Sequence, residues 1–170
     1  MNRSFVIALS GLVCACAPRA DDEAATEADQ PAAATTPAAA TEPGSFTRAQ
    51  FAELRWLEGD WRGSMPNGQP FFERYRVTSD STIQMHAFAD STMTQATDSS
   101  RVYWRDNRIY SGSESVRSVV ARIDSAGVHF VPDGSSGYHY TWKQTGDGWT
   151  ATLNPADPAR RVVYEMRRVR

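Results

Sequence analysis

The sequence predicts an all-β domain, an antiparallel barrel of about eight to ten strands preceded by one short N-terminal helix. From Gly59 onward, apolar and polar residues alternate with a period of two in short runs. Turn residues such as Pro66-Asn67-Gly68 separate these runs at short, regular intervals. No second helical segment is long enough to connect parallel strands, so the strands should be antiparallel, and closing them into a barrel would remove exposed edges.

The first 16 residues have the plan of a secretory signal. Arg3 supplies a positive charge, and residues 5–13 form a short apolar core. This stretch is shorter than the roughly 20 residues that a membrane-spanning helix needs. Cys16, with Ala15 before it and Val13 three residues before it, resembles the lipobox of bacterial lipoproteins.

The lipobox resemblance implies that residues 1–15 are a cleaved signal peptide and that Cys16 carries lipid on its sulfur and an acylated amino terminus. We therefore expect a lipid-anchored protein of the cell envelope. Ala17 stands where aspartate resembles an inner-membrane retention signal, which favours the outer membrane, facing the periplasm. The alternative is an ordinary cleaved signal in which Cys14 and Cys16 are unmodified. Both cysteines lie in this leader, so cysteine nucleophiles and zinc–thiolate sites are excluded from the folded domain.

Residues 16–45 form the expected tether between the lipid and the folded domain. They are rich in Ala, Thr and Pro without apolar periodicity, so they cannot bury enough surface to offset the entropy of ordering. The whole chain has 18 basic and 20 acidic residues. Residues 46–170 keep 16 basic and 14 acidic residues, a net charge of +2. No basic stripe stands out, so we expect no nucleic-acid partner.

Residues 46–170 make up the expected barrel domain, which begins with a helix at about residues 47–58. Thr47 and Gln50 have the spacing of a capping box. Gly59 follows as the residue that ends the helix. The apolar residues that flank the cap or recur at helical spacing are Phe46, Phe51, Leu54 and Leu57.

Strands follow in short order. We expect them around Trp61 and at residues 71–77, 82–89, 101–105, 108–111, 116–123, 128–131, 138–143, 149–153 and 161–169. Residues 90–100 are rich in Ser, Thr and Asp and form either a loop or a poorly paired strand. Asp106-Asn107 indicates a tight hairpin. The residues expected to point inward are Trp61, Phe71, Glu73, Tyr75, Val77, Ile83, Met85, Val102, Trp104, Tyr138, Tyr140, Trp142, Trp149, Ala151, Leu153, Val162, Tyr164 and Met166.

The ends of the domain carry a family resemblance. Gly59-Asp60-Trp61 is similar to the Gly-x-Trp start of lipocalins and other calycin barrels, in which an arginine near the last strand packs over the tryptophan. The resemblance gives structural roles to Gly59, Trp61 and Arg168, with Arg167 next in line. A fuller pattern resembles the DUF6265-like bacterial envelope proteins. Its residues are Leu54-x-Trp56-Leu57-x-Gly59-x-Trp61-x-Gly63, Phe72-Glu73-x-Tyr75 and Tyr164-x-Met166-Arg167-Arg168-Val169.

This second resemblance implies a calycin-like fold but no activity, because none is established for that family. The chain also departs from the family in its middle, where an Asn-Pro-x-His-x-Phe-Pro-like segment is missing. Phe130-Val131-Pro132-Asp133 is its nearest counterpart. A ligand shared with the family therefore does not follow from the resemblance.

Glu73 is in phase with Tyr75 and Val77 and is therefore expected inside the barrel. A carboxylate there needs a partner or a proton. It could anchor a cationic or hydroxylated ligand, or it could form a structural ion pair with Arg168 or Arg122. We expect the ion pair, because a single carboxylate with no second acid does not by itself indicate catalysis.

Aromatic side chains on the inward faces could line a cavity or simply fill a small barrel. Aromatic walls with a few polar groups suit a small, partly apolar ligand. The predicted ligand-binding residues are Glu73, Tyr75, Trp104, Tyr138, Tyr140, Trp142 and Tyr164. We therefore expect non-catalytic binding of such a ligand. The alternative is a structural or interaction protein of the envelope, with a filled barrel and a working outer face.

Histidines and serines give little support for chemistry. His86, His129 and His139 are expected on the surface, and no metal site is predicted. A haem-binding barrel similar to nitrobindin, with His129 or His139 as axial ligand, is a weaker alternative, as is an enzyme that uses Glu73. No Gly-x-Ser-x-Gly elbow and no phosphate-binding loop occurs, so we expect no catalytic residues.

Overall fold

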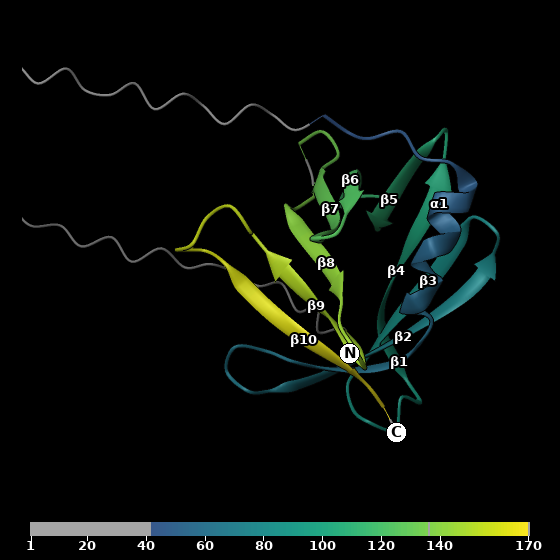
Figure 1. The fold of residues 1–170 in the computed structure, drawn as a ribbon. Helices are drawn as coiled ribbons and strands as arrows, with labels where there is room; N and C mark the ends of the chain where they lie inside the picture. The colour runs from purple at the N-terminus through teal and green to yellow at the C-terminus, as the bar shows by residue number, and fades with distance from the viewer. Residues whose placement is uncertain (1–41, 136, 170) are drawn as a thin grey trace, which may run out of the picture. The chain divides into compact units, whose positions relative to one another are not determined.

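The computed structural model describes residues 42–135 and 137–169, which belong to one compact unit, Ala39–Arg170 (Figure 1). The expected signal peptide, Cys16 and most of the expected tether lie outside the described residues. Within them, ten strands form a closed antiparallel barrel after one short helical segment. The predicted all-β barrel with a short N-terminal helix is thus confirmed.

The helical segment has two parts, the α-helix α1 (Arg48–Ala52) and the 3₁₀ helix η1 (Glu53–Leu57). The capping box forms: the Gln50 N–H donates to Thr47 Oγ1 over 3.2 Å, and the Thr47 N–H donates to Gln50 Oε1 over 2.9 Å. The 3₁₀ turn differs from the single α-helix expected. It brings Leu54 and Leu57, three residues apart, onto one side, where both are buried. No helix in the described part is long and apolar enough to cross a membrane.

Each strand pairs antiparallel with its neighbour in the chain, and β1 also pairs with β10, which closes the barrel. The strands are β1 (Gly59–Ser64), β2 (Pro70–Ser79), β3 (Thr82–Phe88), β4 (Ala96–Arg105), β5 (Arg108–Gly112), β6 (Arg117–Asp124), β7 (Gly127–Pro132), β8 (Tyr140–Gln144), β9 (Gly148–Leu153) and β10 (Val162–Arg168). Strand β4 starts at Ala96, so residues 90–100 are half loop and half strand.

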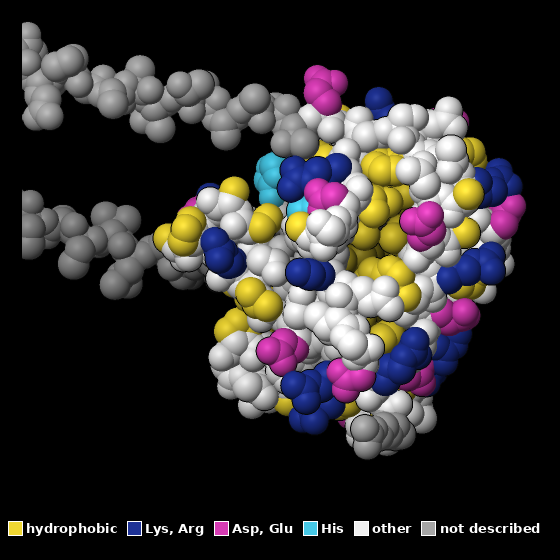
Figure 2. Space-filling model, viewed as in Figure 1, with side chains coloured by type: hydrophobic (Ala, Val, Ile, Leu, Met, Phe, Trp, Pro, Cys, Tyr) yellow, Lys and Arg dark blue, Asp and Glu magenta, His cyan; other side chains and the backbone are white. Residues whose placement is uncertain are grey.

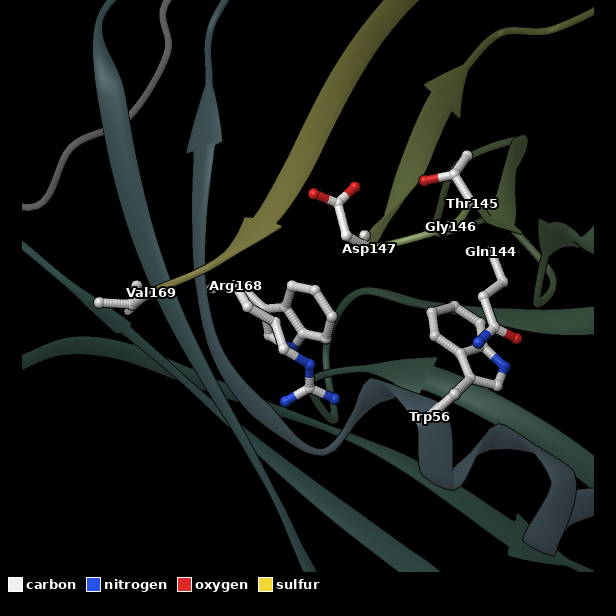
Figure 3. Close-up of a pocket in the computed structure, with 9 residues that line it drawn as sticks. Trp56, Gln144, Thr145, Gly146, Asp147, Arg168 and Val169 are labelled. Atoms are coloured by element: carbon white, nitrogen blue, oxygen red, sulfur yellow. The ribbon is translucent and has the colours of Figure 1, made fainter.

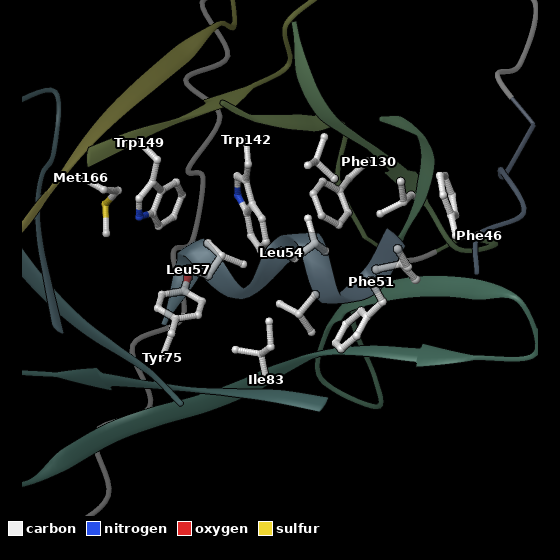
Figure 4. Close-up of a cluster of buried hydrophobic side chains, with 14 of the residues drawn as sticks. Phe46, Phe51, Leu54, Leu57, Tyr75, Ile83, Phe130, Trp142, Trp149 and Met166 are labelled. Atoms are coloured by element: carbon white, nitrogen blue, oxygen red, sulfur yellow. The ribbon is translucent and has the colours of Figure 1, made fainter. Parts of the chain in front are cut away.

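The helix lies across one end of the barrel and fills it (Figure 4). Leu54 and Leu57 point from the helix between Trp142 and Trp149 on one side and Ile83 and Tyr75 on the other. The buried side chains of this core are Phe46, Phe51, Leu54, Leu57, Trp61, Tyr75, Ile83, Val102, Ile109, Val120, Val128, Phe130, Trp142, Trp149 and Met166. The turns at residues 64–70, 88–96, 112–117, 132–140 and 153–162 lie at the opposite end, which the helix does not reach.

The seam between the first and last strands has the contact that the calycin resemblance implied. Trp61 is the register partner of Arg168, whose guanidinium lies 4.5 Å from the centroid of the indole. The same guanidinium donates to the carbonyl of Glu58 over 3.0 Å, and Trp61 Nε1 donates to the carbonyl of Leu57 over 2.6 Å. Gly59 has a φ of 148°, and a Cβ there would clash with Arg168, so this position needs glycine.

Candidate functional site

The half of the barrel away from the helix contains a cavity of about 480 Å³ that opens widely to solvent. Its lining comes from most strands of the barrel. The lining residues are Met65, Phe71, Glu73, Tyr75, Met85, Ala87, Ser100, Val102, Ser111, Tyr138, Tyr140, Trp142, Trp149, Ala151, Leu153, Tyr164 and Met166. Met65 and Tyr138 are exposed and mark the mouth, whereas Trp149 and Met166 belong to the buried core at its deep end.

Six of the seven residues predicted to bind a ligand line this cavity, and Trp104 does not. The structure thus does not bring Trp104 to the cavity, although its ring points inward as expected. Its indole Nε1 donates to the carbonyl of Phe46 over 2.7 Å, and the guanidinium of Arg48 lies 4.9 Å from its ring centroid. Trp104 packs against the core at the helix end, where the N-terminal segment covers it. Alternation identifies the face of a strand that points inward, but not the end of the barrel at which a residue falls.

Glu73 lies on β2 between its register partners Trp61 on β1 and Ala87 on β3. Its Oε2 accepts a hydrogen bond from the hydroxyl of Tyr75 over 2.9 Å. The pleat of the strand places residues i and i+2 on the same face, so the acid and the phenol both point into the cavity.

The expected ion pair of Glu73 with Arg168 or Arg122 is wrong. Arg168 lies over Trp61 at the helix end and bonds a backbone carbonyl there. Arg122 faces outward from β6, and its Nε donates to Asp124 over 2.7 Å. The hydroxyl of Tyr75 takes the place of a cationic partner.

Burial is the main cause of the shifted pKa values of the side chains that line the cavity. It raises the pKa of Glu73 to about 7, although the hydrogen bond from Tyr75 acts in the opposite direction. Burial also raises the pKa values of Tyr75 and Tyr140, so both phenols stay neutral. Among the described residues that line the cavity, none is Lys, Arg, His or Asp. Glu73 is therefore the one cavity group that titrates near neutral pH.

Trp149 adds a second polar feature at the deep end. Its indole N–H is buried and has no hydrogen-bond partner within the described residues. A buried donor without a partner carries a desolvation cost of about 1–3 kcal/mol. Rings of neighbouring aromatic residues surround this indole edge-on, with centroids 6.0 Å away for Tyr75 and 5.5 Å for Trp142. This N–H could therefore donate to a bound molecule or a water.

Four lining residues were not expected to point inward: Met65, Ala87, Ser100 and Ser111. Ala87 is in phase with Met85, and Ser111 is the register partner of Val102, so extending the alternation along β3 and across the β4–β5 hairpin would have found them. Met65 follows β1 in a turn, and no periodic pattern indicates its position.

The three histidines lie away from the cavity. His129 Nε2 is 3.0 Å from Asp124 Oδ1, and its Nδ1 is 3.2 Å from the hydroxyl of Thr141, on the outer face of the barrel. His139 is exposed and precedes β8. The described residues therefore do not fit a haem held inside the barrel by an axial histidine, and among them no cluster of His, Cys, Asp or Glu could hold a metal ion.

Further hollows lie outside the cavity. One of about 300 Å³ adjoins its mouth at Tyr138, and one of about 480 Å³ lies at Arg62 and Phe72 on the outer face. Two more lie beside the helix. One, of about 540 Å³, is a cleft between Trp56, the loop at residues 144–148 and Arg168 (Figure 3). The other, of about 320 Å³, lies between the helix and strands β6–β8, where Figure 2 shows apolar side chains on its floor. Neither holds a buried ionisable group with a shifted pKa, so the cavity that contains Glu73 is the candidate site.

Comparisons with family models, with curated proteins and with solved structures found no match to this chain. The function must therefore be inferred from the barrel and its cavity. The resemblances to lipocalins and to DUF6265-like proteins stay predictions from the residues that carry them.

Proposed function

We propose that this protein binds a small, partly apolar molecule in its barrel without transforming it, as a lipid-anchored protein of the bacterial envelope. The observation that carries the proposal is the cavity of about 480 Å³, which has aromatic walls and one half-buried carboxyl group. Ligand pockets typically measure about 300–1,000 Å³ and combine apolar walls with a few polar groups. A structural protein with a filled barrel is less well supported, because the helix fills only one end.

A binding role fits the lining better than catalysis does. Glu73 is the only carboxyl group among the lining residues, and two-carboxylate mechanisms need a second acid. Ser100 and Ser111 also line the cavity, but no histidine or lysine lines it beside them to activate a hydroxyl. These groups can hold a ligand by hydrogen bonds, and they lack the partners that acyl transfer or glycoside hydrolysis requires.

The place at which the chain joins the barrel is compatible with the proposed anchor. Gly44 donates to the carbonyl of Val120 over 3.0 Å, and Phe46 donates to the carbonyl of Asn107 over 2.8 Å. Asn107 lies in the β4–β5 turn, at the helix end of the barrel. The cavity mouth lies at the other end, so a tether that enters here leaves the mouth open to the aqueous phase.

Blocking the cavity should abolish ligand binding. Ala151→Phe places a ring inside the cavity, and Ala126→Phe places the same ring in the exposed β6–β7 turn as a control. We expect the full-length wild-type protein, purified from the envelope, to carry a small-molecule adduct in native mass spectrometry. The adduct should be lost in Ala151→Phe and kept in Ala126→Phe.

The reverse pattern would refute the proposal. An adduct that persists in Ala151→Phe would place the ligand outside the barrel cavity. A wild-type protein that never carries an adduct would favour a role for the outer face of the barrel over ligand binding in the cavity. Thermal unfolding of both variants checks that they fold.

The anchor itself has a direct test in the pair of leader cysteines. We expect Cys16→Ser to abolish incorporation of an alkyne-labelled palmitate into the protein and to release the protein from the membrane fraction. Cys14→Ser is the matched control and should leave both unchanged, because Cys14 belongs to the segment that is removed. Label that remains in Cys16→Ser would contradict the assignment.

A further inference from the structure

We propose that the barrel binds an organic cation, a protonated amine on a compact apolar body, whose ammonium group pairs with Glu73 between aromatic walls. This inference rests on the proposed function and names the chemical class of the ligand. Three features of the cavity carry it: the unpaired charge of the carboxylate, the aromatic rings around it and the absence of any basic residue among the lining residues.

The carboxylate of Glu73 has no cationic partner among residues 42–135 and 137–169. From β2 it meets the hydroxyl of Tyr75, and its register partners Trp61 and Ala87 on β1 and β3 carry no charge. The other lining residues that can titrate are tyrosines, at positions 138, 140 and 164. The lining residues of β3, β4, β5 and β9 are apolar or carry hydroxyl groups. An ionised Glu73 therefore gives the cavity a negative charge that no group among the described residues neutralises, and a charge held away from bulk water in this way favours a counter-ion.

The aromatic walls favour a cation over other polar ligands. The faces of Trp, Tyr and Phe rings attract an ammonium group within about 6 Å of the ring centroid. Tyr140 stacks on Phe130 with ring centroids 4.3 Å apart, and Trp142 and Trp149 follow, with centroids 5.5 Å apart, toward the deep end. Phe71 on β2 and Tyr164 on β10 pack edge to face, with ring centroids 5.8 Å apart, near the mouth. Aromatic rings therefore line the cavity on β2, which carries Glu73, and on strands β8 to β10.

Other ligand classes fit this lining less well. An anion would place a like charge beside Glu73 without an arginine or lysine to receive it. A neutral alcohol could donate to the carboxylate, but it would leave the charge uncompensated. An amine supplies both the hydrogen-bond donors and the charge.

Binding of a cation should also depend on pH in a defined direction. A paired ammonium stabilises the ionised carboxylate, so binding requires Glu73 to lose its proton. Burial raises the pKa values of Tyr75 and Tyr140, which line the cavity with Glu73, so both phenols stay neutral in this range. The pKa of Glu73 in the empty cavity is about 7. Affinity for an amine should therefore rise about 30-fold between pH 5.5 and pH 8 and level off above that.

The test compares two probes that share one body. Tryptamine carries an ammonium group, and tryptophol carries a hydroxyl group at the same position. Binding is measured by calorimetry with the full-length protein in lipid nanodiscs, because detergent would compete for the cavity, and empty nanodiscs serve as the blank. We expect the wild type to bind tryptamine at least tenfold more tightly than tryptophol at pH 8. Glu73→Gln should lose this preference and still bind tryptophol.

The matched control is Glu165→Gln, which removes an exposed carboxylate from the outward face of β10 and should change neither affinity. Equal affinities of the wild type for the two probes would overturn the inference and leave the proposed function standing. A preference for the amine that survives in Glu73→Gln would also overturn it. If neither probe binds, the inference fails, and the adduct experiment with Ala151→Phe decides separately whether the cavity binds a ligand at all.

Discussion

Leu57→Ala is expected to lower the free energy of unfolding by about 2–5 kcal/mol. Leu57 is fully buried at the end of η1, between the core residues of β8 and β9 and those of β2 and β3. Truncating it removes apolar contacts and leaves a void under a segment whose backbone the Trp61 indole holds in place. Urea unfolding followed by circular dichroism measures the loss.

Leu153→Ala is the control for this prediction. Leu153 also points inward, but it lines the existing cavity and is partly exposed, so its truncation removes fewer contacts. Its loss of stability should be clearly the smaller of the two. If both variants lose the same amount, the helix does not stabilise the barrel in the way that its burial indicates.

Glu73→Gln is expected to stabilise the empty protein at alkaline pH and to leave it nearly unchanged in acid. The pKa of Glu73 is about 7 in the fold, above its ordinary value of 4.5. The folded state therefore holds this proton where the unfolded chain has lost it. The protonated Glu73 therefore contributes to the free energy of unfolding of the wild type. This contribution is fully present below pH 4.5, is lost as the pH rises through 7, and amounts to about 3 kcal/mol. Glutamine does not ionise, so the variant does not suffer this loss.

Urea unfolding of wild type and Glu73→Gln at pH 4, 6 and 8 checks the prediction. The advantage of the variant should grow from near zero to about 3 kcal/mol across this series. Asp60 and Asp124 have lowered pKa values because arginine or histidine side chains bond them. These two groups make both proteins more stable as the pH rises. Their effect is the same in wild type and variant, so it cancels when the two free energies of unfolding are subtracted. Glu165→Gln should show no such dependence on pH. An advantage that is constant with pH would mean that Glu73 is not buried.

The fold was predictable because its determinants are local. Period-two alternation, the turn at Asp106-Asn107 and the capping box at Thr47 each depend on a few neighbouring residues, and the structure contains all three. The inward face was also predictable for most strands, since a hydrophobic face must be buried. These local rules identify elements and faces without any knowledge of the partners of a strand.

The site was less predictable, because it depends on contacts between distant segments. Trp104 falls at the filled end only because the helix lies there. Tyr138 was expected inside a strand, but its backbone N–H and carbonyl both bond the hydroxyl of Ser118 at 2.9 Å, so β8 begins later. The partner of Glu73 and the volume that the helix leaves empty likewise follow from how the ten strands close, which no short window of sequence contains.

The pairing of β1 with β10 has a consequence for how the chain reaches its fold. Trp61 and Arg168 are register partners although more than 100 residues separate them. Folding that waits for such distant pairing is slow, on the order of milliseconds to seconds. Until the last strand arrives, the sheet has two unpaired edges that can join other chains. The interval between synthesis of the chain and pairing of the last strand is therefore the time at which the protein is most exposed to aggregation and most needs a chaperone.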